Sequence, residues 1–141
     1  LSIRGLDAHR LEVTLALRDK PANRMPEAGF VSLTPAGAQD WALRKMGLWH
    51  TGADIVRRGG GQLQGVEAVR ARLGRQLLTT VPLEAALVAP AATPFMPFQP
   101  EVPDYGMGLR FNLYNNKWGT NFPMWWEGTI QFRLVLTLAD A

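Results

Sequence analysis

Apolar and polar residues alternate along several short stretches of this chain, and most of these stretches end at proline, glycine or asparagine. Alternation with a period of two is typical of a β-strand that buries one face. The ten prolines and fourteen glycines among 141 residues favour many turns and short strands over long helices. We therefore predict an all-β fold, an antiparallel β-sandwich that forms a single domain over residues 1–141.

Five stretches alternate clearly enough to be predicted as strands: residues 11–18, 28–33, about 41–46, 109–114 and 130–138. The region from 62 to 82 is ambiguous, because Val66, Val69 and Leu73 also fit the spacing of a helix. We prefer a β-hairpin that closes near Gly74, since glycines interrupt the helical pattern and the following Thr-Thr-Val favours a strand.

Two long segments are predicted to lie outside regular structure. Residues 47–61 are expected to form a loop, because three consecutive glycines at 59–61 do not hold a helix or a strand well. After a short apolar piece at 83–88, five prolines lie in a segment at 89–104. We expect this proline-rich segment to cross the surface of the domain in an extended form, anchored by Phe95 and Phe98.

Composition excludes several classes of function. The chain has no cysteine, so disulfides and cysteine metal sites are excluded. No apolar run reaches the length of a membrane span, and the net charge of +3 is mild. Without such a run we expect no membrane partner. A cluster of arginines between 57 and 75 lies far in sequence from the tryptophan cluster, and acidic residues nearly balance it, so we expect no nucleic-acid partner. The chain begins without Met, and we expect it to be a segment of a longer polypeptide or a processed product.

Residues 109–128 hold three of the five tryptophans, one of the two tyrosines and four asparagines. Asparagine and glycine are turn formers, whereas tryptophan is costly to leave in water. Aromatic rings beside amide groups suit a ligand with an apolar face and many hydroxyls, which is the chemistry of a sugar. The candidate carbohydrate-binding residues are Tyr114, Asn115, Asn116, Trp118, Asn121, Trp125, Trp126 and Glu127.

A structural interpretation of the same residues stays open. Trp118, Phe122 and Trp125 could fill the end of the sandwich while the asparagines cap a tight turn. Both interpretations hold together if Trp125 packs inward and Trp126 faces outward, because adjacent residues of an extended segment point to opposite sides.

Neither a carboxylate pair nor a metal site emerges from the spacing. Glycoside hydrolysis needs two carboxylates, and the candidates are Glu84, Glu101, Asp104 and Glu127. Glu127 is the best placed because it follows two tryptophans, but we favour the simpler interpretation, a surface or turn carboxylate that bonds loop amides. The only histidines, His9 and His50, lack the spacing of a metal site, and a pair of His50 with Asp54 is the one alternative. We predict no catalytic residue, no metal and no cofactor in this segment.

The stretch at 112–128 reads NLYNNKWGTNFPMWWEG and is followed at 132–136 by FRLVL. It resembles the C-terminal end of an uncharacterised microbial family whose N-terminal part is similar to the glycoside hydrolase family 38 α-mannosidases. Weaker similarity extends over DKPANR at 19–24, PEA at 26–28, KMG at 45–47 and LEAALVAP at 83–90. The chain departs from the family at Glu84 and Ala86, where Asp and Pro are expected.

The resemblance implies a β-sandwich that follows a catalytic barrel, with the catalytic carboxylates and the zinc ligands upstream of this chain. None of those residues can be assigned to a position here. The expected partners are therefore an upstream catalytic domain of the same polypeptide and a carbohydrate. The expected function is a non-catalytic C-terminal β-sandwich that supports or borders a carbohydrate site; a free-standing carbohydrate-binding module and a purely structural domain are the alternatives.

Overall fold

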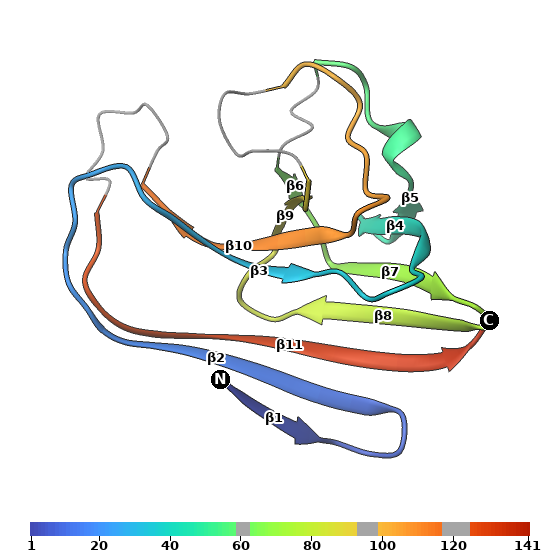
Figure 1. Cartoon of the computed structure of the whole chain (residues 1–141), viewed down its shortest axis with the longest axis horizontal. Helices are drawn as coiled ribbons and strands as arrows, with labels where there is room; N and C mark the ends of the chain where they lie inside the picture. The colour runs from blue at the N-terminus through green and yellow to red at the C-terminus, as the bar shows by residue number, and fades with distance from the viewer. Residues whose placement is uncertain (59–62, 93–98, 117–124) are drawn as a thin grey trace.

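Two antiparallel β-sheets form the fold in a computed structural model of the chain, which describes residues 1–58, 63–92, 99–116 and 125–141 (Figure 1). The larger sheet, sheet A, has in spatial order the strands β1 (Ser2–Gly5), β2 (Arg10–Lys20), β11 (Gly128–Asp140), β8 (Gln76–Pro82), β7 (Ala68–Leu73), β4 (Gln39–Lys45) and β5 (Leu48–His50). The smaller sheet, sheet B, has the order β3 (Ala28–Leu33), β10 (Leu109–Asn115), β9 (Leu87–Pro90) and β6 (Gln64–Gly65). This all-β, antiparallel sandwich confirms the predicted fold class.

The clearest sequence patterns become strands close to their predicted bounds. The alternating leucines and valine of the first pattern lie in β2, and the last pattern forms β11, the longest strand at 13 residues. Within the segment from 62 to 82, residues 68–82 form the hairpin of β7 and β8, with Gly74 in its turn at a φ of 61°. Residues 64 and 65 form the separate strand β6, which pairs with β9 in sheet B. The helical alternative for this segment is wrong. Among the described residues there is also no α-helix that could span a bilayer.

Three strands were not predicted. The expected loop at 47–61 contains β5, which pairs with β4, and a 3-10 turn, η1 (Gly52–Asp54), so that expectation is wrong for these residues. Residues 55–58 lie outside helices and strands, as expected. Strand β1 is short and exposed, and its position follows only from its pairing with β2. Strand β9 covers the first residues of the proline-rich segment, while Phe95 and Phe98 lie outside the described residues.

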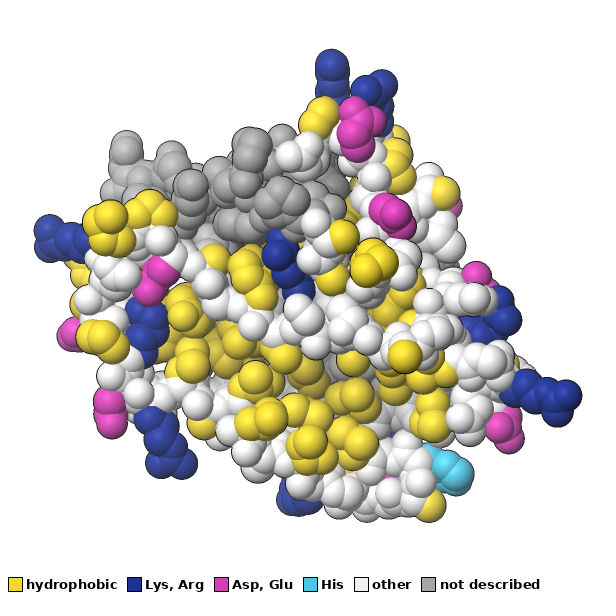
Figure 2. Space-filling model, in the orientation of Figure 1, with side chains coloured by type: hydrophobic (Ala, Val, Ile, Leu, Met, Phe, Trp, Pro, Cys, Tyr) yellow, Lys and Arg dark blue, Asp and Glu magenta, His cyan; other side chains and the backbone are white. Residues whose placement is uncertain are grey.

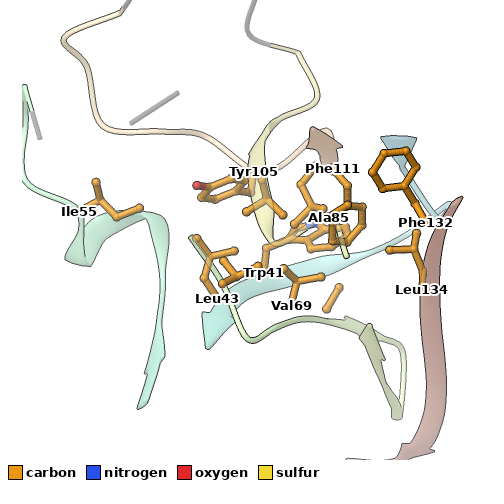
Figure 3. Close-up of a cluster of buried hydrophobic side chains, with 13 residues drawn as sticks. Trp41, Leu43, Ile55, Val69, Ala85, Tyr105, Phe111, Phe132 and Leu134 are labelled. Carbon is orange, nitrogen blue, oxygen red and sulfur yellow. The ribbon is translucent and has the colours of Figure 1, made fainter. Parts of the chain in front are cut away.

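The core lies between the two sheets (Figure 3). Sheet A contributes Leu43 and Val69, and sheet B contributes Val88, Leu109 and Phe111, all of them fully buried. Figure 3 shows side chains from both sheets converging on this region. Burial of such residues supplies the main favourable free energy of folding, because each removes a large apolar area from water.

Sheet A is wider than sheet B, with seven strands against four. The side chains of β4 and β7 that face sheet B are buried, and so are Phe132 and Leu134 of β11. On the far side of β11, the corresponding side chains of β2 are only partly buried, and Ile3 of β1 is exposed. Sheet B therefore buries the side chains of one half of sheet A completely and those of the other half only in part.

Candidate functional site

The predicted carbohydrate-binding residues that the structure describes gather at one corner of the sandwich. Here β2 ends, β11 begins and β10 ends, on the left-hand side of Figure 1. Gly128 of β11 pairs with Lys20 of β2, which brings the tryptophans next to the segment at 21–27. We call the following group the aromatic corner: Lys20, Arg24, Glu27, Tyr114, Asn116, Trp125 and Trp126.

Tyr114 is held by a glycine on the neighbouring strand. It lies opposite Gly29 in the pairing of β10 with β3. A Cβ atom at Gly29 would lie only 2.3 Å from a ring carbon of Tyr114, so no larger residue fits there without displacing the ring. Trp126 then packs its ring against Tyr114 at 79°, with 5.6 Å between ring centroids. An edge-to-face pair of this kind is favourable because of the ring quadrupoles.

Lys20 lies close to both of these rings. Its Nζ is 5.0 Å from the ring centroid of Trp126 and 5.4 Å from that of Tyr114. The same Nζ forms an ion pair of 2.5 Å with Glu27 and donates to the carbonyl oxygens of Pro21 and Trp126. The three N–H groups of this largely buried ammonium group thus have three acceptors. The hydrogen bond from Lys20 is also the main reason why the pKa of Glu27 is lowered.

Asn116 is a structural residue in this arrangement. Its Oδ1 accepts from the backbone N–H of Glu27 at 2.7 Å, and its Nδ2 donates to the carbonyl oxygens of Asn23 and Met25 at 3.1 and 2.8 Å. Its own N–H donates to the carbonyl oxygen of Glu27. Because the buried amide is occupied by backbone groups, Asn116 has no donor left for a ligand. The role of Asn116 is structural, but its amide bonds the distant segment at 23–27 and does not cap a tight turn of its own loop.

Trp125 presents the exposed surface of the corner. Its side chain is 40% exposed, and the guanidinium carbon of Arg24 lies 4.4 Å from its ring centroid. Glu127, two residues further on, is also exposed. The two tryptophans have the reverse of the orientation under which both interpretations would hold together, since Trp126 packs on Tyr114 and Trp125 faces outward. The strong contact between Trp126, Lys20 and Tyr114 is the physical reason.

The structure says less about the remaining predicted carbohydrate-binding residues. Asn115 is the last residue of β10 and lies opposite Ala28. Trp118 and Asn121 lie outside the described residues. Sequence reasoning missed Lys20, Arg24 and Glu27 as members of the site. They lie 89 to 106 positions from their partners in the aromatic and amide segment, and no local pattern connects such distant residues.

The other candidate carboxylates have structural partners. Glu84 accepts from the Nε and the backbone N–H of Arg133 at 2.9 and 2.7 Å, and Glu101 pairs with Arg57 at 2.8 Å. Asp104 accepts from the backbone N–H of Gly106. The hydrogen bond from the Arg133 side chain lowers the pKa of Glu84. A general acid for glycoside hydrolysis needs the opposite displacement.

The pair of His50 and Asp54 has a local explanation. Asp54 accepts from the backbone N–H and the hydroxyl of Thr51 at 2.6 and 2.9 Å, which caps η1. These bonds lower the pKa of Asp54, and His50 adds a smaller electrostatic contribution. In the described parts of the chain, no three His, Asp or Glu side chains come together as a metal site would require.

In comparisons with known proteins, no family model, curated protein or solved structure matches this chain.

Proposed function

We propose that this chain is a non-catalytic β-sandwich, the C-terminal part of a glycoside-hydrolase-like protein, which borders a carbohydrate site on an upstream catalytic domain. The resemblance of residues 112–128 to a family with an α-mannosidase-like N-terminal part motivates this proposal. The observation that carries it is the exposed ring of Trp125 beside Arg24 and close in sequence to Glu127.

The chemistry of this surface suits a sugar. The C–H face of a pyranose stacks on an aromatic ring, while its hydroxyls donate to carboxylates and accept from guanidinium groups. Trp125 offers the ring, Arg24 offers N–H donors and Glu127 offers acceptors. One open platform of this size makes few contacts, so it would supply only part of a complete site.

The interior of the corner supports the platform by holding it in one geometry. Lys20 connects β2 to the carbonyl of Trp126, and Asn116 fixes the segment that carries Arg24. A preorganised binding surface loses less conformational entropy when a ligand binds. This arrangement gives the inner residues a positioning role and leaves ligand contact to the outer ones.

The carboxylates support the non-catalytic part of the proposal. Every described carboxyl group with a displaced pKa is displaced downward, namely Asp7, Glu27, Asp54 and Glu84. Groups of this kind remain ionised at neutral pH and are poor proton donors. Turnover of aryl glycosides by the isolated 141-residue chain would refute this part directly.

Affinity separates the proposal from a free-standing module. A bordering platform predicts binding of mannose-rich oligosaccharides in the millimolar range, about −4 kcal/mol. Isothermal titration should show this weak binding for the wild type and its loss in Trp125→Ala. The matched control is Trp49→Ala, because Arg70 lies 4.3 Å above Trp49 in the same kind of contact, away from the corner. Micromolar affinity would instead indicate a free-standing module.

A purely structural role is the second candidate, and one observation favours it. Asn116 and Trp126, two of the predicted ligand residues, are occupied by contacts within the corner. If the whole corner were structural, Trp125→Ala would leave binding unchanged. If the platform binds, the same substitution would abolish binding with little loss of stability.

A further inference from the structure

One side of sheet A carries an apolar surface that sheet B leaves open. The strand register places Ile3 opposite Val13, and Val13 opposite Leu134, which faces the core. These side chains therefore point to the side on which sheet B lies. We define the open face as the apolar residues on this side that remain partly or fully exposed: Ile3, Leu11, Val13, Leu15, Leu17, Leu78, Ile130, Leu136 and Leu138. Of these, Val13, Leu17 and Leu136 also pack partly against the core.

The open face is continuous and accessible. Figure 2 shows apolar side chains gathered over the lower part of the molecule, where β11, β2 and β1 lie in Figure 1. Ile3 is 66% exposed and Ile130 is 38% exposed, whereas Val69 and Ala71, on the same side of β7, are fully buried. A contiguous apolar surface of this kind marks an interface more often than an ordinary solvated surface.

No charged side chain interrupts this surface. Between Leu11 and Leu17, and between Ile130 and Leu138, every charged residue points to the opposite side of the sheet. Those residues are Glu12 and Arg133, which form ion pairs there with Arg4 and Glu84. The two sides of sheet A are therefore clearly different, with a charged outer side and an uncharged open face.

We propose that the open face binds the open face of a second copy of this chain, forming a two-fold symmetric dimer. In such a dimer each side chain lies near residues of the identical surface, so a charge at the centre would meet its own like charge. An uncharged face satisfies this requirement. Each copy then covers the part of the other copy's sheet A that sheet B leaves uncovered. The two facing sheets would lie about 10 Å apart, as in other β-sandwiches.

The area is sufficient for a weak specific dimer. Strand β2 has 11 residues. At about 3.3 Å per residue and about 4.8 Å between strands, a surface of three to four strands covers roughly 500 Å². Two copies then bury roughly 1,000 Å² in total, which is the lower limit for a specific interface.

Sedimentation equilibrium of the full chain over a range of micromolar concentrations tests this proposal. The wild type should fit a monomer–dimer equilibrium, and Ile3→Glu should weaken dimerisation at least about tenfold, since it places two like charges in the interface. The control is Ala16→Glu, which adds the same charge on the outer side of β2. Leu11→Gln provides a second variant without a new charge.

Three results would overturn the proposal. The first is a wild type that stays monomeric at every concentration. This outcome includes the case in which the open face binds another domain of the same polypeptide. The second is assembly beyond dimers. The third is equal weakening by Ile3→Glu and Ala16→Glu while far-UV circular dichroism shows that both variants remain folded. The carbohydrate-binding experiment is independent of all three, because Trp125 and Arg24 are not part of the open face.

Discussion

The two halves of sheet A carry the same alternation of apolar and polar residues but differ in what lies above them. In β4 and β7, sheet B covers the apolar side, and Leu43 and Val69 are fully buried. In β1 and β2, the apolar side is covered less completely: Ile3 is exposed, and the apolar side chains of β2 are only partly buried. An alternating pattern therefore specifies which side of a strand avoids water, but not which element covers that side.

The largest expected effect is a difference between the two halves of sheet A in how much a Leu→Ala substitution lowers the free energy of unfolding. Leu43→Ala should lower the free energy of unfolding by about 3–5 kcal/mol, because it leaves a cavity in a closely packed core. Leu15→Ala on the open face should cost about 1 kcal/mol, since its side chain already contacts water. Urea denaturation at a monomeric concentration measures both. Equal costs would show that the halves do not differ in burial.

The next largest effect concerns the aromatic corner, where the segment at 23–27 rather than a sheet lies against the end of β10. Asn116→Ala should cost about 1–2 kcal/mol, because it leaves partly buried backbone groups of the 23–27 segment without partners. Asn116→Asp is a useful companion, since it keeps the shape and the acceptor but removes the two donated bonds. A cost near zero in Asn116→Ala would mean that the corner does not depend on this amide.

The pH dependence of stability tests the ion pair in the same corner. The folded-state pKa of Glu27 is lowered from its ordinary value of 4.5, chiefly by Lys20. Its contribution to stability is therefore complete above the unfolded pKa and disappears as the pH falls through the lower, folded pKa. Urea denaturation of the wild type and Glu27→Gln should show a difference at neutral pH that shrinks on acidification. A difference that persists at low pH would contradict the role of the ionised carboxylate.

The smallest effect is expected at the outer edge of the open half. Ile3→Ser should change the stability of the monomer by less than about 0.5 kcal/mol, because Ile3 is exposed and lies on an edge strand. Thermal unfolding at low concentration measures this change. A cost comparable to that of Leu43→Ala would mean that the open face is covered within the monomer.

The sequence predicts the strands well where burial alone dictates the pattern. The leucines of β2 and β11 and the turn at Gly74 are such cases. It predicts poorly where pairing with a distant strand creates the structure, as in β1 and β5, whose short segments have no distinct pattern. Edge strands of this kind depend on a neighbour for their hydrogen bonds rather than on their own side chains.

The candidate site was predicted in part for the same reason. The aromatic and amide residues at 112–128 are conspicuous because their types are costly in water or favour turns. Their roles depend on contacts across the fold that spacing does not reveal. Trp126 packs against Lys20, and the missing side chain of Gly29 leaves room for the ring of Tyr114. Such contacts arise from tertiary packing, which overrides local pattern.

The carbohydrate platform can be tested most directly through the indole N–H signals of the five tryptophans in a ¹⁵N-labelled chain. Titration with a mannose-rich oligosaccharide to millimolar concentration should shift the signals of Trp125 and Trp126, while buried Trp41 and distant Trp49 remain unchanged. Unshifted Trp125 and Trp126 signals at saturating sugar, or equal shifts at Trp41 and Trp49, would contradict the platform.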